Sequence, residues 1–188
     1  LKNSKKIPKA ITKSQIDEIF NSLNNSKSKN SKIYIMVLRL MFLSGLRVSE
    51  ALNLRWSDLN INDFSLNIYG KGSKERKVYL TQDFSKQLSH LKSNSIFIFH
   101  IKNKPISTRT INKFLNDSLK KGIINKSLSS HIFRHSFATT MLENNADIRH
   151  IQKLLGHSSI STTEIYTKVA KSLKKNVLDS YHPLKNKL

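Results

Sequence analysis

The sequence contains no cysteine, so disulfides and thiolate metal sites are excluded, and the composition suits a reducing cytoplasm. No run of about 18 apolar residues occurs, so no membrane span is predicted. The first residue is Leu1 rather than methionine, and no signal-peptide pattern follows it. These features favour a fragment or processed product that works in the cytoplasm.

Acidic residues are also scarce. Asp and Glu total 12 against 33 Lys and Arg, which gives a formal net charge of +21. Such a balance indicates a polyanionic partner, most often nucleic acid. A lysine-rich composition from an AT-biased genome would raise the lysine content, but it would not explain so few acids. An anionic membrane surface is the main competing partner, although no basic amphipathic helix stands out for it.

What is present is helical periodicity in a chain of 188 residues, a length that fits one domain with a real core. Residues 12–24 predict a helix capped by Thr12 or Ser14. Residues 32–44 are apolar almost all round, which is typical of a buried core helix, and a short helix follows Gly45. Further helices are predicted over residues 80–93, 107–122, 129–145, 146–156 and 168–181.

Residues 65–80 change period and predict a β-hairpin, with "GKGSK" as its flexible connection. No internal repeat appears. The fold class is therefore mainly α with one small antiparallel β-sheet, that is, α+β.

Several segments carry residues suited to phosphate chemistry. His131 and Arg134 are three apart and share a helix face, and Ser129 and Ser130 can cap that helix at an end where amides attract phosphate. Arg47 follows an apolar helix so closely that it needs a partner, either a phosphate or the carboxylate of Glu50. Alternatively, the histidines are ordinary helix residues and Arg47 with Glu50 is a purely structural pair.

Two further segments are weaker on their own. Lys71 lies between Gly70 and Gly72, and glycines let the backbone approach an anion closely, although an ordinary polar turn explains the same pattern. His157 follows Gly156, and the isolated Tyr166 comes nine residues later. Either these two fill unrelated structural places or they meet around one substrate atom.

Taken together, the order Arg47, Lys71, His131, Arg134, His157, Tyr166 resembles the active site of the tyrosine recombinases (phage-integrase-like proteins), most closely the Xer type. "SGLRVSEALNL" resembles their first box, "GKGSKERKVYL" their lysine hairpin, and "HIFRHSFATTMLENNADIRHIQKLLGHSSISTTEIYTKV" their second box. The departures are Thr140, Asn145 and Lys168, and none of them falls on a catalytic position. The resemblance covers nearly the whole chain and implies the tyrosine recombinase catalytic-domain fold.

The resemblance implies transesterification at a DNA phosphodiester. Tyr166 would be the nucleophile, forming a 3′-phosphotyrosyl link. Lys71 would protonate the leaving 5′-oxygen, and His131 would be the acid/base toward the tyrosine. Arg47, Arg134 and His157 would bind the phosphate, with Glu50 orienting Arg47. No cofactor or metal is expected, because the fixed cations can replace one and no carboxylate cluster exists to hold Mg²⁺.

The same resemblance implies a domain organisation and partners. Residues 1–188 would be the catalytic domain, with 1–9 a linker remnant and the N-terminal core-binding domain absent. The partners would be double-stranded DNA, a homo- or hetero-tetramer on synapsed sites, and a DNA translocase; no membrane is involved. The roles would be chromosome dimer resolution (chromosome partition) or integration and excision of a mobile element. The competing functions are a type IB topoisomerase and a non-catalytic DNA-binding module.

Overall fold

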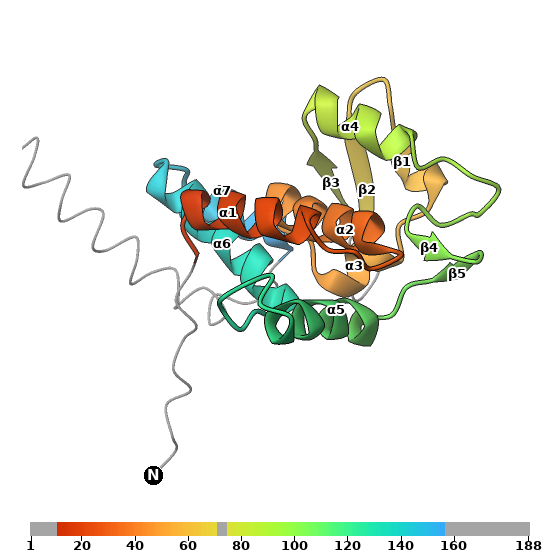
Figure 1. Cartoon of the computed structure of the whole chain (residues 1–188). Coiled ribbons are helices and arrows are strands. Elements are labelled where there is room, and N and C mark those ends of the chain that lie inside the picture. Colours follow the sequence, from red (N-terminus) through yellow and green to blue (C-terminus); the bar gives the residue numbers. More distant parts are fainter. Residues whose placement is uncertain (1–10, 71–74, 157–188) are drawn as a thin grey trace, which may run out of the picture.

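A computed structural model describes residues 11–70 and 75–156 of the chain (Figure 1). In chain order its elements are α1 (Lys13–Asn24), α2 (Ser31–Ser44), α3 (Val48–Leu52), a 3-10 turn (Trp56–Asp58), β1 (Leu59–Asn60), β2 (Ser65–Tyr69), β3 (Glu75–Tyr79), α4 (Gln82–Ser89), β4 (His100–Ile101), β5 (Lys104–Pro105), α5 (Thr108–Lys120), α6 (Ser130–Glu143) and α7 (Ile148–Leu155). Every helix expected within these ranges is present. The helix expected over 168–181 lies outside the described residues.

Helix α2 is the centre of the helical part, and α1, α3, α5 and α6 pack around it (Figure 1). It is buried on most of its circumference, as its apolar sequence predicts. Helix α1 begins at a capping box: Thr12 accepts from the amide of Gln15, while the Gln15 side chain accepts from the amide of Thr12. The predicted apolar face of α1 is buried in the core, namely Ile16, Ile19, Phe20 and Leu23.

The predicted hairpin is β2 and β3, which pair antiparallel with Leu66 opposite Val78 and Ile68 opposite Arg76. Strand β1 adds to the outer side of β2, so the sheet has the order β1-β2-β3. Figure 1 shows this sheet beside α4 and away from α1 and α6. Strand β2 ends at Tyr69 and strand β3 begins at Glu75, so the sheet fixes the two residues between which the hairpin connection lies.

A second small sheet was not expected. Strands β4 and β5 pair antiparallel across Lys102 and Asn103, which have φ of 51° and 62°. Two successive residues with positive φ suit the tight turns of two-residue hairpins. The prediction of a single sheet was wrong here, because strands of two residues are too short to show periodicity and "KN" is a weak turn signal.

A smaller apolar cluster joins α6 to α7 beside the main core. Its buried members are Phe137, Ala138, Leu142, Ile151 and Leu155. The turn before α7 contains Asn145 with φ of 62°, a left-handed conformation that asparagine tolerates better than most residues. Among the described helices, none combines the length and apolar character needed to cross a bilayer.

Candidate active site

The end of α2 and the start of α3 place the first arginine. Gly45, with φ of 66°, ends α2, and Arg47 occupies the position just before α3. Glu50, in the first turn of α3, reaches back so that its Oε2 accepts from the backbone amide of Arg47 at 2.8 Å. A carboxylate at this point is also favoured by the positive end of the helix dipole. The local sequence therefore holds Glu50 and Arg47 together.

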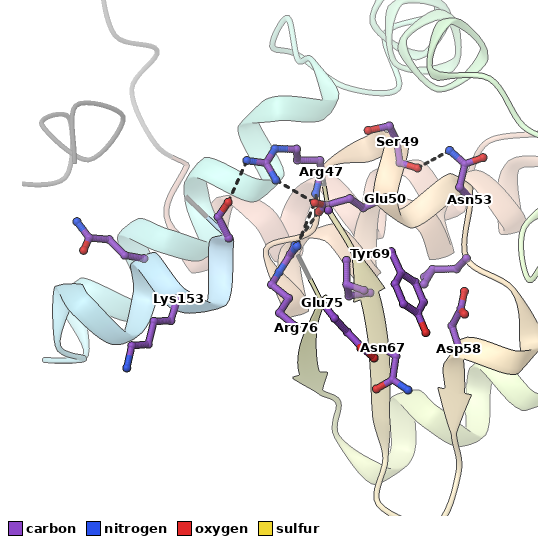
Figure 2. A pocket seen from close by; sticks show the side chains of 15 residues that line it. Arg47, Ser49, Glu50, Asn53, Asp58, Asn67, Tyr69, Glu75, Arg76 and Lys153 are labelled. Atoms are coloured by element: carbon purple, nitrogen blue, oxygen red, sulfur yellow. Dashed lines mark hydrogen bonds and ion pairs between the residues drawn. The ribbon is translucent and has the colours of Figure 1, made fainter. Parts of the chain in front are cut away.

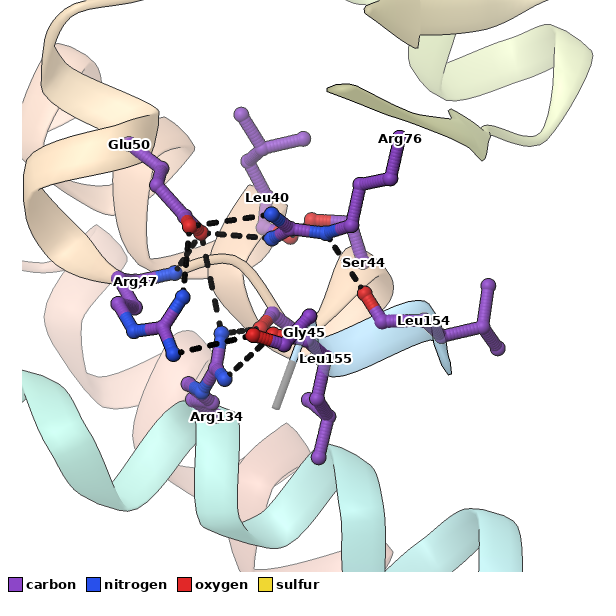
Figure 3. Close-up of polar contacts among 10 residues, drawn as sticks. Leu40, Ser44, Gly45, Arg47, Glu50, Arg76, Arg134, Leu154 and Leu155 are labelled. Carbon is purple, nitrogen blue, oxygen red and sulfur yellow. Dashed lines mark hydrogen bonds and ion pairs between the residues drawn. The ribbon is translucent and has the colours of Figure 1, made fainter. Parts of the chain in front are cut away.

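The Glu50 carboxylate is the centre of a cluster of arginines (Figure 3). Its Oε1 accepts from Arg47 Nη1 at 2.9 Å and from Arg76 Nη1 at 3.1 Å. Its Oε2 accepts from Arg76 Nη2 at 2.7 Å and lies 3.8 Å from Arg134 Nη1. Three segments far apart in the sequence, in α3, β3 and α6, thus converge on one carboxylate.

The same arginines bind the carbonyl groups at the end of α7. Arg76 Nε donates to the carbonyl of Leu154 at 2.8 Å, and Arg134 Nη2 donates to that of Leu155 at 2.8 Å. Arg47 Nη2 makes a longer contact of 3.5 Å to the carbonyl of Gly156. The last carbonyls of a helix have no partner within the helix and carry its partial negative charge. The arginines therefore fix the end of α7 against the cluster.

Arg134 also ties the cluster to the core, because its Nη1 donates to the carbonyl of Gly45 at 2.6 Å. Gly45 has no room for a side chain: a Cβ atom there would lie 2.5 Å from Phe137 and 2.8 Å from Leu155. The end of α2 is thus pressed against α6 and α7. This close approach brings the Gly45 carbonyl to the guanidinium.

Burial by itself raises the pKa of Glu50, but hydrogen bonds from Arg76 and Arg47 outweigh it, so the pKa lies below its usual value. The carboxylate is charged at neutral pH and its side chain is only 7% exposed. One negative charge faces three positive ones, so the cluster retains an excess of positive charge. Such a cluster can attract an additional anion.

A pocket of about 800 Å³ opens beside the cluster between α3, β2, β3 and the end of α7 (Figure 2). Arg47, Glu50 and Arg76 line it, and Lys153 adds another basic side chain. Arg47 is 41% exposed, whereas Arg134 is 9% exposed. Arg47 is therefore the arginine that solvent and a ligand reach most readily, and Arg134 lies deeper.

The structure brings Arg47, Glu50 and Arg134 together, as expected from the sequence. His131 lies one turn before Arg134 in the first turn of α6 and is exposed. Lys71, His157 and Tyr166 lie outside the described residues. Their roles stay predictions. The residues that precede two of them, Gly70 and Gly156, both line the pocket beside the arginines.

The start of α6 differs from the expectation. Ser129 occupies the capping position, but its side chain makes no capping bond, and the hydroxyl of Ser130 is buried without a hydrogen-bond partner among the described residues. Instead, Asn112 of α5 accepts from the backbone amide of Ser130 at 3.1 Å. Serine capping from within the segment was therefore wrong. A side chain from another helix performs the capping, which local sequence does not reveal. Farther along α6, burial lowers the pKa of His135.

Arg76 was missed by the sequence analysis, although it makes two hydrogen bonds to Glu50. The signal was present in the alternation of β3. Glu75, Lys77 and Tyr79 point outward, whereas Arg76 and Val78 lie on the inner face. An arginine on the inner face of a strand needs a buried partner.

Metal binding was not expected, and within residues 11–70 and 75–156 no group of three or more His, Cys, Asp or Glu side chains is placed to hold an ion. Metal-independent chemistry stays a prediction.

A mainly helical domain with small antiparallel strands, in which Arg47 and Arg134 lie close together and Glu50 contacts Arg47, agrees with what the sequence resemblance implied. Residues 9–172 match the phage integrase family. A tyrosine recombinase from Agathobacter rectalis is 39% identical over 173 residues, which are 86% of this chain and 56% of the relative. XerC from Pediococcus pentosaceus is 35% identical over 97% of this chain and 65% of its own length.

Among solved structures, the XerA recombinase is similar with a TM-score of 0.74 and 27% identity, over 94% of this chain and 66% of that one. The chain belongs to the phage integrase family. It spans about 56% to 65% of the length of these curated relatives. The predicted family and fold class are confirmed.

Proposed function

We propose that this chain is the catalytic domain of a tyrosine-type site-specific DNA recombinase, which cuts and rejoins strands through a 3′-phosphotyrosyl intermediate. The observation that carries the proposal is the convergence of Arg47 and Arg134 on Glu50 beside an open pocket. Had the two guanidinium groups lain on opposite sides of the molecule, no common phosphate site would exist. The charge of +21 supports DNA as the partner.

In the proposed reaction, the Tyr166 oxygen attacks phosphorus, and the bond from phosphorus to the 5′-oxygen breaks. The phosphate ends on the tyrosine, and the leaving oxygen takes a proton to become a 5′-hydroxyl. Rejoining reverses these steps, so the bond energy is conserved and no ATP is needed. Arg47 and Arg134 bind the nonbridging oxygens, on which negative charge is concentrated as phosphorus becomes five-coordinate.

Magnitudes indicate where catalysis is most needed. Ionising a tyrosine with a pKa of about 10 costs roughly 4 kcal/mol at pH 7. Expelling an alkoxide is harder, because its basicity is on the order of that of hydroxide, whose parent water has a pKa of about 15.7. We therefore assign the general acid to Lys71, with His131 assisting the tyrosine and His157 donating to the phosphate.

The proposal extends to the setting of the reaction. The chain would act on double-stranded DNA in the cytoplasm, at the nucleoid, as part of a tetramer on two synapsed sites. Chromosome dimer resolution is the role that the similarity to XerC favours, with integration or excision of a mobile element as the alternative. A DNA translocase is a further partner in this scheme.

The test is covalent capture of DNA. A pool of nicked suicide duplexes with a randomised region is incubated with the protein in EDTA, and DNA that remains attached to protein in detergent is recovered. We expect an adduct from the wild type and none from Tyr166→Phe, which differs by one oxygen. An equal yield from the phenylalanine variant contradicts the proposed nucleophile, and an adduct that requires a divalent ion contradicts metal independence.

A second experiment tests the general acid. Lys71→Ala should lose cleavage of an ordinary duplex and regain it on a duplex with a 5′-bridging sulfur, which leaves without protonation. Lys74→Ala is the matched control in the same hairpin connection. If Lys74→Ala shows the rescue and Lys71→Ala does not, the general acid has been assigned to the wrong lysine.

A relaxation assay on supercoiled DNA tests the competing function. Relaxation of supercoiled DNA without pairing of sites would indicate a type IB topoisomerase instead.

A further inference from the structure

Arg76 is the least exposed basic side chain of the hairpin strand β3. It lies opposite Ile68 of β2 on the inner face of the sheet, and its side chain is 12% exposed. The neighbouring residues Glu75 and Lys77 point outward and are exposed. Arg76 is thus directed away from solvent and toward the carboxylate of Glu50 (Figure 3).

The guanidinium of Arg76 uses each of its three nitrogens in a described hydrogen bond. Nη1 and Nη2 form a fork on the two oxygens of Glu50, at 3.1 and 2.7 Å. Nε donates to the carbonyl of Leu154 at 2.8 Å. A planar fork of this kind fixes orientation as well as charge, which a lysine cannot reproduce.

These bonds join three elements that carry different parts of the site. Strand β3 begins directly after residues 71–74, helix α3 directly follows Arg47, and α7 ends at Leu155, two residues before His157 in the sequence. Arg76 also shares Glu50 Oε1 with Arg47 Nη1, so it restrains the carboxylate that orients Arg47. In Figure 2 Arg76 lies between the α7 end and the strands that line the pocket.

We propose that Arg76 is a positioning residue for the cleavage step: it holds Glu50 on Arg47 and holds the end of α7 on the sheet, so that the hairpin and the segment before His157 keep a fixed relation to the phosphate site. This inference rests on the proposed function for its catalytic consequence. The geometric part, that Arg76 fixes Glu50 and the α7 end, does not depend on it.

The charges around Glu50 support a positioning role. The charged groups within 4 Å of its carboxylate, among the described residues, are Arg47 just before the same helix, Arg76 on β3 and Arg134 on α6. Arg134 is the most distant, at 3.8 Å. Burial raises the pKa of Glu50, and without Arg76 this effect is opposed chiefly by the hydrogen bonds from Arg47. The pKa of Glu50 should therefore rise when Arg76 is removed. Protonated Glu50 would no longer hold Arg47 by charge.

The variants are Arg76→Lys, which keeps the charge and loses the fork, and Arg76→Gln, which loses both. The substrate is a duplex identified by the covalent capture described above. We expect its single-turnover cleavage rate to fall by about 10- to 100-fold in each variant, the range typical of slight misplacement of reacting groups. Affinity for DNA should change by less than about threefold, because Arg76 is bound within the protein and makes no phosphate contact in this scheme. The acid limb of the cleavage profile should move to higher pH in Arg76→Gln.

Lys77→Met is the matched control, since it removes one cation from the adjacent position of the same strand. Lys77 pairs only with the exposed Asp63 among the described residues, and we expect cleavage at the wild-type rate. Cleavage by both Arg76 variants within twofold of the wild type, with an unchanged pH profile in Arg76→Gln, overturns the proposal. An equal loss in Lys77→Met also overturns it, because loss of hairpin charge would then be the cause.

Two measurements that do not depend on catalysis test the proposal even if neither the wild type nor any variant cleaves DNA. Amide hydrogen exchange of the last turn of α7 should quicken in Arg76→Lys and Arg76→Gln, while α1 exchanges at its wild-type rate. Carbon-13 titration of Glu50 should show a higher pKa in Arg76→Gln. Unchanged exchange and titration refute the positioning role, whereas absence of an adduct from the wild type refutes only the proposed function.

Discussion

Strand β3 carries two neighbouring cations, Arg76 and Lys77, that form ion pairs of nearly equal length in opposite surroundings. Arg76 Nη2 lies 2.7 Å from Glu50, with side-chain exposures of 12% and 7%. Lys77 Nζ lies 2.9 Å from Asp63, with exposures of 44% and 39%. Judged by contact distance alone, the two ion pairs would be expected to contribute equally to stability.

The two pairs differ because water screens one and not the other. An exposed pair gains little, since water solvates both ions and long side chains lose freedom on pairing. A buried pair has lost its solvation, so removing one partner leaves an uncompensated charge. We therefore expect the Arg76–Glu50 pair to hold the site in place, whereas the Lys77–Asp63 pair should contribute little to stability. Substitutions that remove one partner of either pair should therefore differ widely in their effects.

Glu50→Ala should have the largest effect, because it leaves the buried Arg134 and the mostly buried Arg76 without their shared carboxylate. We expect a loss of about 3–5 kcal/mol in the free energy of unfolding, the range for breaking a buried pair. Urea unfolding measures it, and Asp63→Ala is the matched control, with a much smaller expected loss, because Asp63 pairs with Lys77 at the surface and accepts one hydrogen bond from Ser65. Similar losses in both variants would show that burial does not separate the pairs.

Gly45→Ala should come second, since it tests packing of the same site without removing a charge. A methyl group would meet Phe137 at 2.5 Å, and the residue has a left-handed φ. We expect a loss of about 2–4 kcal/mol from overpacking and backbone strain together. Gly122→Ala has the same φ but nothing within 4 Å, so it should lose only about 1–2 kcal/mol from strain. Equal losses would contradict the close approach of α2 to α6.

The pH dependence of Glu50 should give a smaller effect, because protonation keeps the shape of the side chain. The folded pKa of Glu50 is lowered by its arginine partners despite burial, so its contribution is full above the unfolded pKa, near 4.5, and is lost as pH falls through the folded value. The stability difference between wild type and Glu50→Gln should therefore shrink below about pH 4.5. A difference that grows on acidification would reverse the assigned sign.

Arg47→Ala should change stability least within the cluster, by about 1 kcal/mol or less, since its side chain is 41% exposed. Its effect should appear in DNA binding instead. If Arg47 contacts one phosphate, the slope of log affinity against log salt should become shallower by about 0.9. Fluorescence anisotropy at several salt concentrations measures the slope, with Lys77→Ala as the exposed comparison. An unchanged slope would remove Arg47 from the phosphate site.

Most of the fold within the described residues could be predicted from sequence, because long helices carry periodicity and caps. Helix α1 has its Thr12 cap and apolar face, and α2 is apolar throughout, so both were placed nearly to the residue. The hairpin followed from the change of period at residue 65. Strands β1, β4 and β5 were missed since two residues are too few to show alternation.

The site was partly predictable. The grouping of Arg47, Glu50 and Arg134 follows from the family resemblance, and the structure brings them together. Arg76 and the capping by Asn112 were not anticipated, because both depend on contacts between segments distant in sequence: Arg76 meets residues 26 and 78 positions away. The roles of Lys71, His157 and Tyr166 are predictions still to be tested.

Identifying the amino acid that carries the DNA after covalent capture tests the proposed nucleophile directly. The adduct would be digested with protease and nuclease, and the modified peptide sequenced by tandem mass spectrometry. We expect a nucleotide on Tyr166. Tyr69 and Tyr79 are internal controls, because they are 61% and 65% exposed on the hairpin strands. A nucleotide on either of them, or on a serine, would contradict the proposed mechanism.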